Sequence, residues 1–210
     1  MKKIDLKYEI LDKQRRSILP LLKKFKSDFY LAGGTGLALQ IGHRDSVDFD
    51  FFSYRSFNTV KLYKKIKEIF SDFKIKKIQD EKNTLTILLD NKIKISFFSY
   101  PYKLINSIVE DEYLRVASIL DISSMKLSAI VSRATIKDYL DIYFILQQYS
   151  LEKLLKVTGK KFNDLDRNLI LKSLVYFSDV TKEPIRYKTT KITWQQVQNF
   201  LKKEVLKIKF

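Results

Sequence analysis

The sequence GGT at residues 33–35, followed by SVDFDF at residues 46–51, decides the fold of this chain. A strand over 47–52 would place Ser46, Asp48 and Asp50 on one face and the apolar residues between them on the other. Two neighbouring carboxylates are costly to bury unless a cation neutralises them, and Mg²⁺ binds one or two carboxylates together with substrate phosphates. A glycine turn can hold phosphate on its N–H groups. The two stretches therefore predict a site for a metal-bound nucleoside triphosphate.

Composition narrows the classes of protein that this chain can belong to. Its 210 residues are 45% hydrophobic, which is enough for one large domain or two small domains packed together. It has no cysteine and only one histidine, so a disulfide framework, a thiolate zinc site and a histidine-rich metal centre are excluded. Any metal is expected on oxygen ligands. The polar N-terminus and the lack of a long apolar run predict a cytoplasmic protein with no membrane partner.

The charge is strongly positive. Lys and Arg number 40 against 24 for Asp and Glu, a formal net charge of +16. This excess favours a polyanionic partner, nucleic acid before an anionic membrane. The alternative is a lysine-rich bias of the whole proteome.

The first 120 residues alternate between strand and helix patterns, and the rest are helical. Gly42 is expected to end the helix over 35–41, and Asp90-Asn91 to form a hairpin turn. Helices are predicted over 4–26, 35–41 and 58–70, and strands over 29–32, 47–52, 73–79, 84–89, 92–99 and 113–117. We expect an α/β core over 1–120 and a helical lobe over 121–210, packed together without a flexible linker.

Capping residues mark the later helices. Asp121 or Ser123 is expected to cap a helix that runs to residue 134, and Thr135 the next helix, to about residue 148. Ser150 and Thr193 are expected to cap two more, with a further helix over 164–177 between them. Trp194 and Phe200 are expected to anchor the last helix, over 194–207, to the rest of the protein.

A second cluster of charges falls on the first two of these helices. Lys126 and Arg133 share a helix face with a small residue between them, which leaves room for an anion. Asp138 and Asp141 share a face of the next helix. Two interpretations stay open. The cations hold a triphosphate or an RNA backbone while one acid orients a catalytic group, or all four are solvated ion pairs between neighbouring helices.

Taken together, LAGGTGLAL at 31–39, HRDSVDFDFF at 43–52, KLSA at 126–129 and the charged residues up to 141 resemble the AbiEii/AbiGii-type nucleotidyltransferase toxins. The resemblance covers about residues 28–148. It implies an α+β fold, a DNA-polymerase-β-like nucleotidyltransferase core with a mixed sheet, followed by a C-terminal helical bundle. It also implies a toxin of a bacterial toxin–antitoxin or abortive-infection system. Such a toxin would transfer a nucleotide from an NTP to RNA, at the 3′ end of tRNA, and would have a cognate antitoxin.

The resemblance also implies roles for particular residues. Asp48 and Asp50 would ligate Mg²⁺ or Mn²⁺. Lys126 would act both in catalysis and on the nucleotide, and the spacing leaves open which of Asp138 and Asp141 is the last acid of the motif. With Lys126, the catalytic residues would be Ser46, Asp48, Asp50, Asp138 and Asp141. The other nucleotide-binding residues would be Gly33, Gly34, Thr35, Arg44 and Arg133. His43 fits the motif as a packed or capping residue.

One position departs from the pattern of this superfamily. Polymerase-β-like enzymes usually carry a third carboxylate on a neighbouring strand, where this chain has Ser96, and Asp90 is too far along the turn. Without that carboxylate the base for an attacking hydroxyl is missing. Either Asp138 or Asp141 replaces it, or the acceptor is a small-molecule or protein hydroxyl, or the chain is a nucleic-acid-binding protein with a degenerate site.

Overall fold

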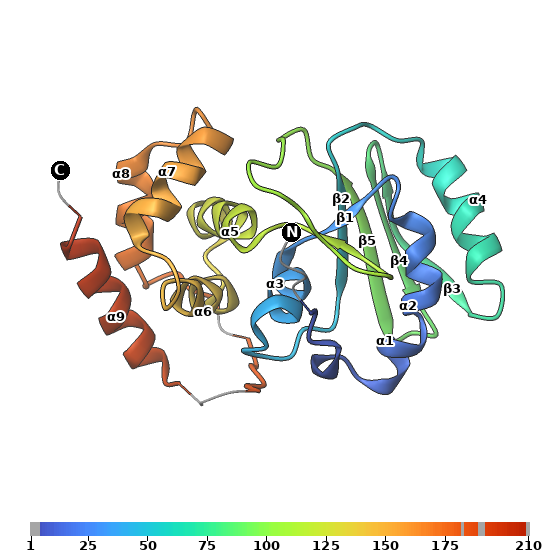
Figure 1. Ribbon diagram of the computed structural model, residues 1–210, viewed down its shortest axis with the longest axis horizontal. Coiled ribbons are helices and arrows are strands. Elements are labelled where there is room, and N and C mark those ends of the chain that lie inside the picture. The colour runs from blue at the N-terminus through green and yellow to red at the C-terminus, as the bar shows by residue number, and fades with distance from the viewer. Residues whose placement is uncertain (1–4, 182, 189–191, 209–210) are drawn as a thin grey trace.

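The computed structural model describes residues 5–181, 183–188 and 192–208. Within these residues the strands form one seven-stranded mixed sheet, in the order β3-β4-β5-β2-β1-β7-β6 (Figure 1). The pairs β2–β5 and β1–β7 are parallel, and the other neighbours are antiparallel. The strands are β1 (Tyr30–Leu31), β2 (Phe49–Ser53), β3 (Ile75–Glu81), β4 (Thr84–Leu89), β5 (Ile93–Ser99), β6 (Val109–Glu110) and β7 (Arg115–Val116).

Helices cover the sheet unequally. One face packs on α2 and α4, with a core that includes Phe25, Ile66 and Phe97, while α3 and α5 to α9 gather on the other side (Figure 1). The helices are η1 (Tyr8–Ile10), α1 (Lys13–Ser17), α2 (Leu19–Leu22), η2 (Lys23–Phe25), α3 (Gly33–Ile41), α4 (Thr59–Ile69), α5 (Ile119–Arg133), α6 (Ile136–Ile145), α7 (Leu151–Lys161), α8 (Arg167–Val175) and α9 (Trp194–Leu206). None of the helices within the described residues is long and apolar enough to cross a bilayer.

The prediction of one helix over 4–26 is wrong for the described residues 5–26. The Asp12 side chain accepts a hydrogen bond from the Arg15 N–H and starts α1 there, and Pro20 lies in the first turn of α2. Proline has no N–H to continue a preceding helix, so the segment divides into short turns. These turns curl over the sheet and bury Ile18 and Leu22.

The acidic strand begins later than predicted. β2 starts at Phe49, so Ser46 and Asp48 lie in the loop before it and only Asp50 belongs to the strand. Phe49 and Phe51 are in the core as expected, but Val47 is half exposed. Val47 precedes the strand, so its side chain does not have to follow the alternation of strand side chains between buried and exposed faces.

The capping residues predicted from the sequence are correct for two helices and wrong for two others. Ser150 caps α7 and Thr193 caps α9 with their side chains, as predicted. Ser118, rather than Asp121 or Ser123, caps α5 by accepting from the Asp121 N–H. Thr135 occupies the N-cap position of α6, but its hydroxyl donates to the Asp138 carboxylate instead of accepting from the helix.

Helices α5 to α9 enclose a second apolar core. The Trp194 ring meets Tyr139 edge-on at 5.6 Å, and Phe200 meets Tyr143 at 4.8 Å, so the predicted anchoring of α9 is confirmed. Leu37 of α3 and Tyr30 of β1 belong to this core as well. Side chains from the first 120 residues and from the C-terminal helices thus pack in one core. This core marks no boundary at residue 120, and the division of the chain there stays a prediction.

Candidate active site

A cleft of about 1260 Å³ separates the sheet from α5 and collects residues from both predicted clusters. Its lining includes most of the residues that the sequence singled out from 33–50 and from 126–138, although the second group begins 76 positions after the first one ends. Those lining residues are Gly33, Gly34, Arg44, Ser46, Asp48, Asp50, Lys126, Arg133 and Asp138. The fold therefore joins the two clusters into one candidate site.

The two carboxylates on β2 and its preceding loop form the acidic centre of this cleft. Asp50 points from the strand, and burial followed by the nearby charge of Asp48 raises its pKa. Asp48 is more open, and its Oδ2 lies 3.0 Å from Lys94 Nζ. Asp50 is thus a partly compensated negative charge that a further cation would stabilise.

The register of the sheet defines what stands beside Asp50. Parallel pairing of β2 with β5 sets Asp50 opposite Ser96, whose buried hydroxyl counteracts the rise in the pKa of Asp50. A hydroxyl therefore occupies the neighbouring strand position where the superfamily pattern would place a carboxylate. Asp90 lies at the β4–β5 turn, where its carboxylate accepts from the Lys74 N–H.

The donor set around Asp48 and Asp50 suits a hard divalent cation. Two carboxylates and the Ser46 and Ser96 hydroxyls provide only oxygen, which Mg²⁺ and Mn²⁺ prefer. The described part of the chain holds no group of three His, Cys, Asp or Glu side chains arranged for a metal. Two protein carboxylates are enough for an ion that completes its coordination with substrate phosphates and water.

The glycine turn lies against this acidic centre. Gly33 has φ of +64°, and a Cβ there would lie 3.2 Å from Asp50 Oδ2. A Cβ on Gly34 would lie 2.6 Å from Arg44 Nη2. Only glycine fits both positions, and they open α3, whose first N–H groups have no partner within the helix. The helix N-terminus thus faces the same cleft as the carboxylates.

Thr35 supports the loop that carries Ser46 and Asp48. Its side chain is buried, its hydroxyl donates to the main-chain carbonyl of Asp48, and its Oγ1 lies 2.7 Å from Ser46 Oγ. The sequence predicted Thr35 on the triphosphate. Its hydroxyl is instead hydrogen-bonded within the protein, so only its backbone N–H could contact the triphosphate.

Lys126 is the centre of a largely buried ionic network at the wall of the cleft. Its Nζ lies 2.7 Å from Asp138 Oδ1 and 2.6 Å from Asp141 Oδ2. Asp138 also accepts from Arg133 Nε at 3.1 Å and from the Thr135 hydroxyl at 2.8 Å. The two acids lie on a common helix face, as predicted, and both pair with Lys126. The expected ion pairs between neighbouring helices are therefore present, but these three side chains are buried and not solvated.

Asp141 ties the HRD stretch to α6. It accepts from His43 Nε2 at 2.7 Å and from Arg44 Nε and Nη2 at 2.7 and 2.9 Å. Burial alone would raise the pKa of Asp141, but the charges of Arg44 and Lys126 and these hydrogen bonds hold it well below its usual value. His43 is packed as predicted, against the Phe144 ring at 5.0 Å.

These contacts bear on the roles predicted for the helical acids. Asp141 is fully buried and Asp138 nearly so, and the pKa of each carboxyl lies below its usual value. Burial opposes that shift at Asp138, where Lys126 and Arg133 outweigh it. A strongly paired carboxylate is a poor proton acceptor, so these contacts favour a role in holding cations over a role as the base, and the replacement of the absent strand carboxylate by Asp138 or Asp141 stays a prediction.

No sequence pattern singled out Lys94 and Arg15, which are among the cations of this site. Lys94 pairs with Asp48, and Arg15 reaches the cleft from α1. Arg15 is 8% exposed, and its Nε donates to Val47 O at 2.6 Å while its Nη2 donates to Lys92 O at 2.9 Å. It joins the loop before Asp48 to the start of β5. Nothing in the sequence distinguishes these two among 40 basic residues.

Replacing Arg15 by Met is expected to loosen this joint. Two partly buried carbonyls lose a charged donor, and a hydrogen bond to a charged group is worth about 1.5–3 kcal/mol of stability. Because Asp48 follows Val47, the Mg²⁺ concentration for half-maximal transfer should rise by about 10- to 100-fold, as for supporting residues of metal sites. Arg15→Lys should recover part of this loss, and Arg16→Met, on the exposed neighbour, should change neither quantity. Equal Mg²⁺ requirements in Arg15→Met and wild type would contradict the role.

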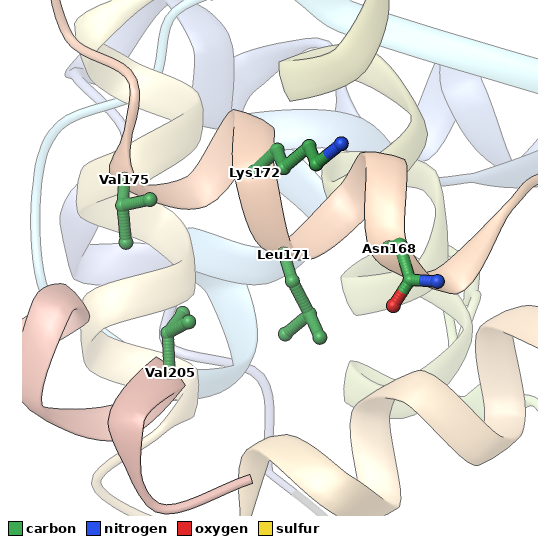
Figure 2. A pocket seen from close by; sticks show the side chains of 5 residues that line it. All are labelled: Asn168, Leu171, Lys172, Val175 and Val205. Atoms are coloured by element: carbon green, nitrogen blue, oxygen red, sulfur yellow. The ribbon is translucent and has the colours of Figure 1, made fainter. Parts of the chain in front are cut away.

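A second cavity lies far from these residues. It has a volume of about 400 Å³ and is formed between α8 and α9 (Figure 2). Its lining is mainly aliphatic, with one cation, Lys172, and no carboxylate or glycine turn. It therefore offers nothing for nucleotide or metal chemistry.

Comparisons with known proteins agree with this geometry. The family described as nucleotidyl transferase AbiEii toxin, type IV TA system, matches residues 21–207. The uncharacterized protein aq_aa25 of Aquifex aeolicus (strain VF5) is 37% identical over 185 residues, which cover 85% of this chain and 87% of that protein.

Solved structures share the fold at low sequence identity. MenT4, a nucleotidyltransferase toxin of Mycobacterium tuberculosis H37Rv, superposes with a TM-score of 0.57 at 16% identity, over 90% of this chain and 80% of that one. JHP933 from Helicobacter pylori gives 0.56 at 15% identity, over 96% and 94% of the two chains. The predicted α+β nucleotidyltransferase fold with C-terminal helices is confirmed. With its family matched over most of its length, this chain belongs to the AbiEii toxins of type IV toxin–antitoxin systems and is a nucleotidyltransferase.

Proposed function

We propose that this nucleotidyltransferase moves a nucleoside monophosphate from an NTP to the 3′ end of tRNA, with Mg²⁺ held by Asp48 and Asp50. One observation carries the proposal: the two carboxylates lie in a cleft that also contains the Gly33-Gly34 turn and the paired cations of α5. Nucleotidyltransferases of this kind generally use a divalent metal ion, and the toxin–antitoxin family implies nucleotide substrates and an antitoxin partner.

The side chains of the cleft suit the steps of this reaction. The N–H groups at the start of α3 bind the triphosphate, with the glycines allowing its close approach. Lys126 and Arg133 carry positive charge beside the carboxylates, and the low pKa of Asp138 and Asp141 keeps the counter-charges fixed while substrate binds. When bound, Mg²⁺ neutralises charge that develops on the transferring phosphoryl group. Pyrophosphate leaves and the acceptor oxygen forms the new phosphodiester bond.

The choice of RNA as acceptor follows from charge. A net charge of +16 attracts a polyanion, whereas a small cationic acceptor would favour an acidic cleft. Arg133, whose side chain is 62% exposed, and Lys137 lie along the cleft, where they can contact an RNA backbone. The alternative acceptor, a small-molecule or protein hydroxyl, is favoured by Ser96, because the base for an RNA 3′-hydroxyl is not supplied by that strand.

A transfer assay tests the proposal. Purified protein is incubated with Mg²⁺, total bacterial tRNA and each of four α-labelled NTPs, and products are separated on a denaturing gel. We expect label at the tRNA 3′ end, no label after EDTA treatment, and no label on tRNA whose 3′ end has been oxidised with periodate. Label on the protein itself, or none on RNA with any NTP, would contradict tRNA as the acceptor.

A further inference from the structure

An aromatic row lies next to the acidic centre on the same face of the sheet. The parallel register that pairs Asp50 with Ser96 pairs Phe52 with Phe98 two residues later. Two residues of a strand span about 6.6 Å. The Phe52 and Phe98 rings therefore follow directly after the carboxylate along the floor of the cleft.

These rings are partly exposed in the cleft. Phe52 and Phe98 have centroids 5.3 Å apart, and Tyr100 meets Phe52 edge-on at 5.5 Å. All three line the cleft, and none is classed among the fully buried core. Aromatic faces left open beside charged groups gain free energy when a flat apolar ring covers them.

Helix α5 lines the same cleft. Met125, Ser128 and Ala129 lie one helical turn apart and all line it. Ser128 and Ala129 have short side chains, which leave more room in the cleft than large ones would. We call the part of the cleft lined by the aromatic row and by these small residues the slot.

The position of the slot relative to the Gly33-Gly34 turn indicates which part of a nucleotide it would hold. The Gly33-Gly34 turn and Ser46 lie on the side of Asp50 where β2 begins, and Phe52 lies on the opposite side, toward the end of the strand. A triphosphate held at the glycine turn, with its α-phosphate at Asp48 and Asp50, directs its ribose and base toward Phe52 and Phe98.

We infer that Phe52 and Phe98 stack the base of the incoming nucleoside triphosphate, in the slot that the Ser128–Ala129 part of α5 also lines. This inference rests on the proposed use of an NTP and adds the position of its base. Stacking on aromatic rings tolerates every base, because each has a flat face. The contact therefore supplies affinity for all four nucleotides.

Calorimetric titration separates the base from the phosphates. The probes are ATP, CTP, GTP, UTP and inorganic tripolyphosphate, each with Mg²⁺, titrated into wild type and Phe98→Leu. Leucine retains apolar volume but cannot stack. We expect Phe98→Leu to raise the Kd of all four NTPs by about tenfold, the scale of one stacking contact. The Kd of tripolyphosphate, which has no base, should not change.

A matched control and a second variant complete the test. Tyr102→Leu changes a ring of the same aromatic cluster, 4.9 Å from Tyr100 but outside the cleft lining, and should leave every Kd unchanged. Ser128→Trp fills the slot from the half-buried wall of α5 and should weaken NTPs but not tripolyphosphate, even if Phe98→Leu does not fold.

The outcomes separate this inference from the proposed function. Equal losses for NTPs and tripolyphosphate, no loss at all, or a wild type that binds tripolyphosphate as tightly as NTPs would overturn base stacking here. A raised KM for tRNA with an unchanged NTP Kd would assign the rings to the acceptor's terminal base and also overturn it. If the NTPs bind more tightly than tripolyphosphate and Phe98→Leu removes this difference, but no RNA is labelled, the stacking site would stand. Only the RNA acceptor would then be overturned.

Discussion

Asp48→Asn is expected to reduce nucleotidyl transfer by at least about a thousandfold while leaving the fold intact. In the proposed site this carboxylate supplies half of the charge that would hold the metal, and metal stabilisation of a phosphoryl transition state is worth several kcal/mol. The Asp48 side chain is 41% exposed, and its pair with Lys94 is of the surface type. Such pairs contribute about 0–1 kcal/mol, so the Tm should fall by no more than about 4 °C.

Two measurements accompany this variant. Mg²⁺ should raise the Tm of the wild type by binding the folded state, and this rise should disappear in Asp48→Asn. Glu183→Gln is the matched control, because Glu183 also lines the cleft but pairs with Lys137 at its edge. It should retain both transfer and the Mg²⁺-dependent rise. Transfer by Asp48→Asn at the wild-type rate would remove Asp48 from the metal site.

Asp141→Ala is expected to cause a large loss of stability. Removal of the carboxylate leaves Arg44 and part of the charge of Lys126 buried without a partner. Breaking a buried pair in this way costs about 3–5 kcal/mol. For a chain of this size that corresponds to a fall in Tm of roughly 6–20 °C. Thermal unfolding followed by circular dichroism measures it.

The exposed pair Lys65–Asp28 provides the control for this experiment. Asp28→Ala breaks an ion pair of similar length, 3.2 Å, between side chains that are 39% and 56% exposed. Water solvates both charges after the mutation, so the loss should stay below about 1 kcal/mol. If both variants lost the same stability, burial would not be what makes the Asp141 network costly to break.

The same carboxylate makes stability depend on acid. The pKa of Asp141 is lower in the folded protein than in the unfolded chain, so its contribution is fully present above the unfolded value, near 3.8, and is lost as the pH falls further. Protons bind preferentially to the unfolded state in that range. Stability of the wild type should therefore decline below about pH 4, and Asp141→Ala should show a shallower decline there.

Local patterns predicted most of the elements. The alternation over 84–89 and 92–99 and the turn between them predicted a hairpin, and both turn residues, Asp90 and Asn91, have positive φ as such a turn requires. Gly42 ends α3 with φ of +70°. These features depend on neighbours in sequence, which is why they can be read without the fold. The prediction of a single N-terminal helix was wrong because Asp12 and Pro20 interrupt an apolar pattern that otherwise suits a helix.

The sequence by itself determined the glycine turn, the acidic pair and the presence of a helical C-terminal part, because each depends on residues close together in the chain. It also determined the family, because the motifs that mark the family keep their order along the chain. Only the tertiary structure decided that Lys126 joins Asp138 and Asp141, that Arg15 joins two carbonyls of distant loops, and that Ser96 and Phe98 lie beside Asp50 and Phe52. Parallel strands and packed helices bring together residues that no local pattern relates. The partner of a charge is therefore decided by the fold, even where the charge itself is plain in the sequence.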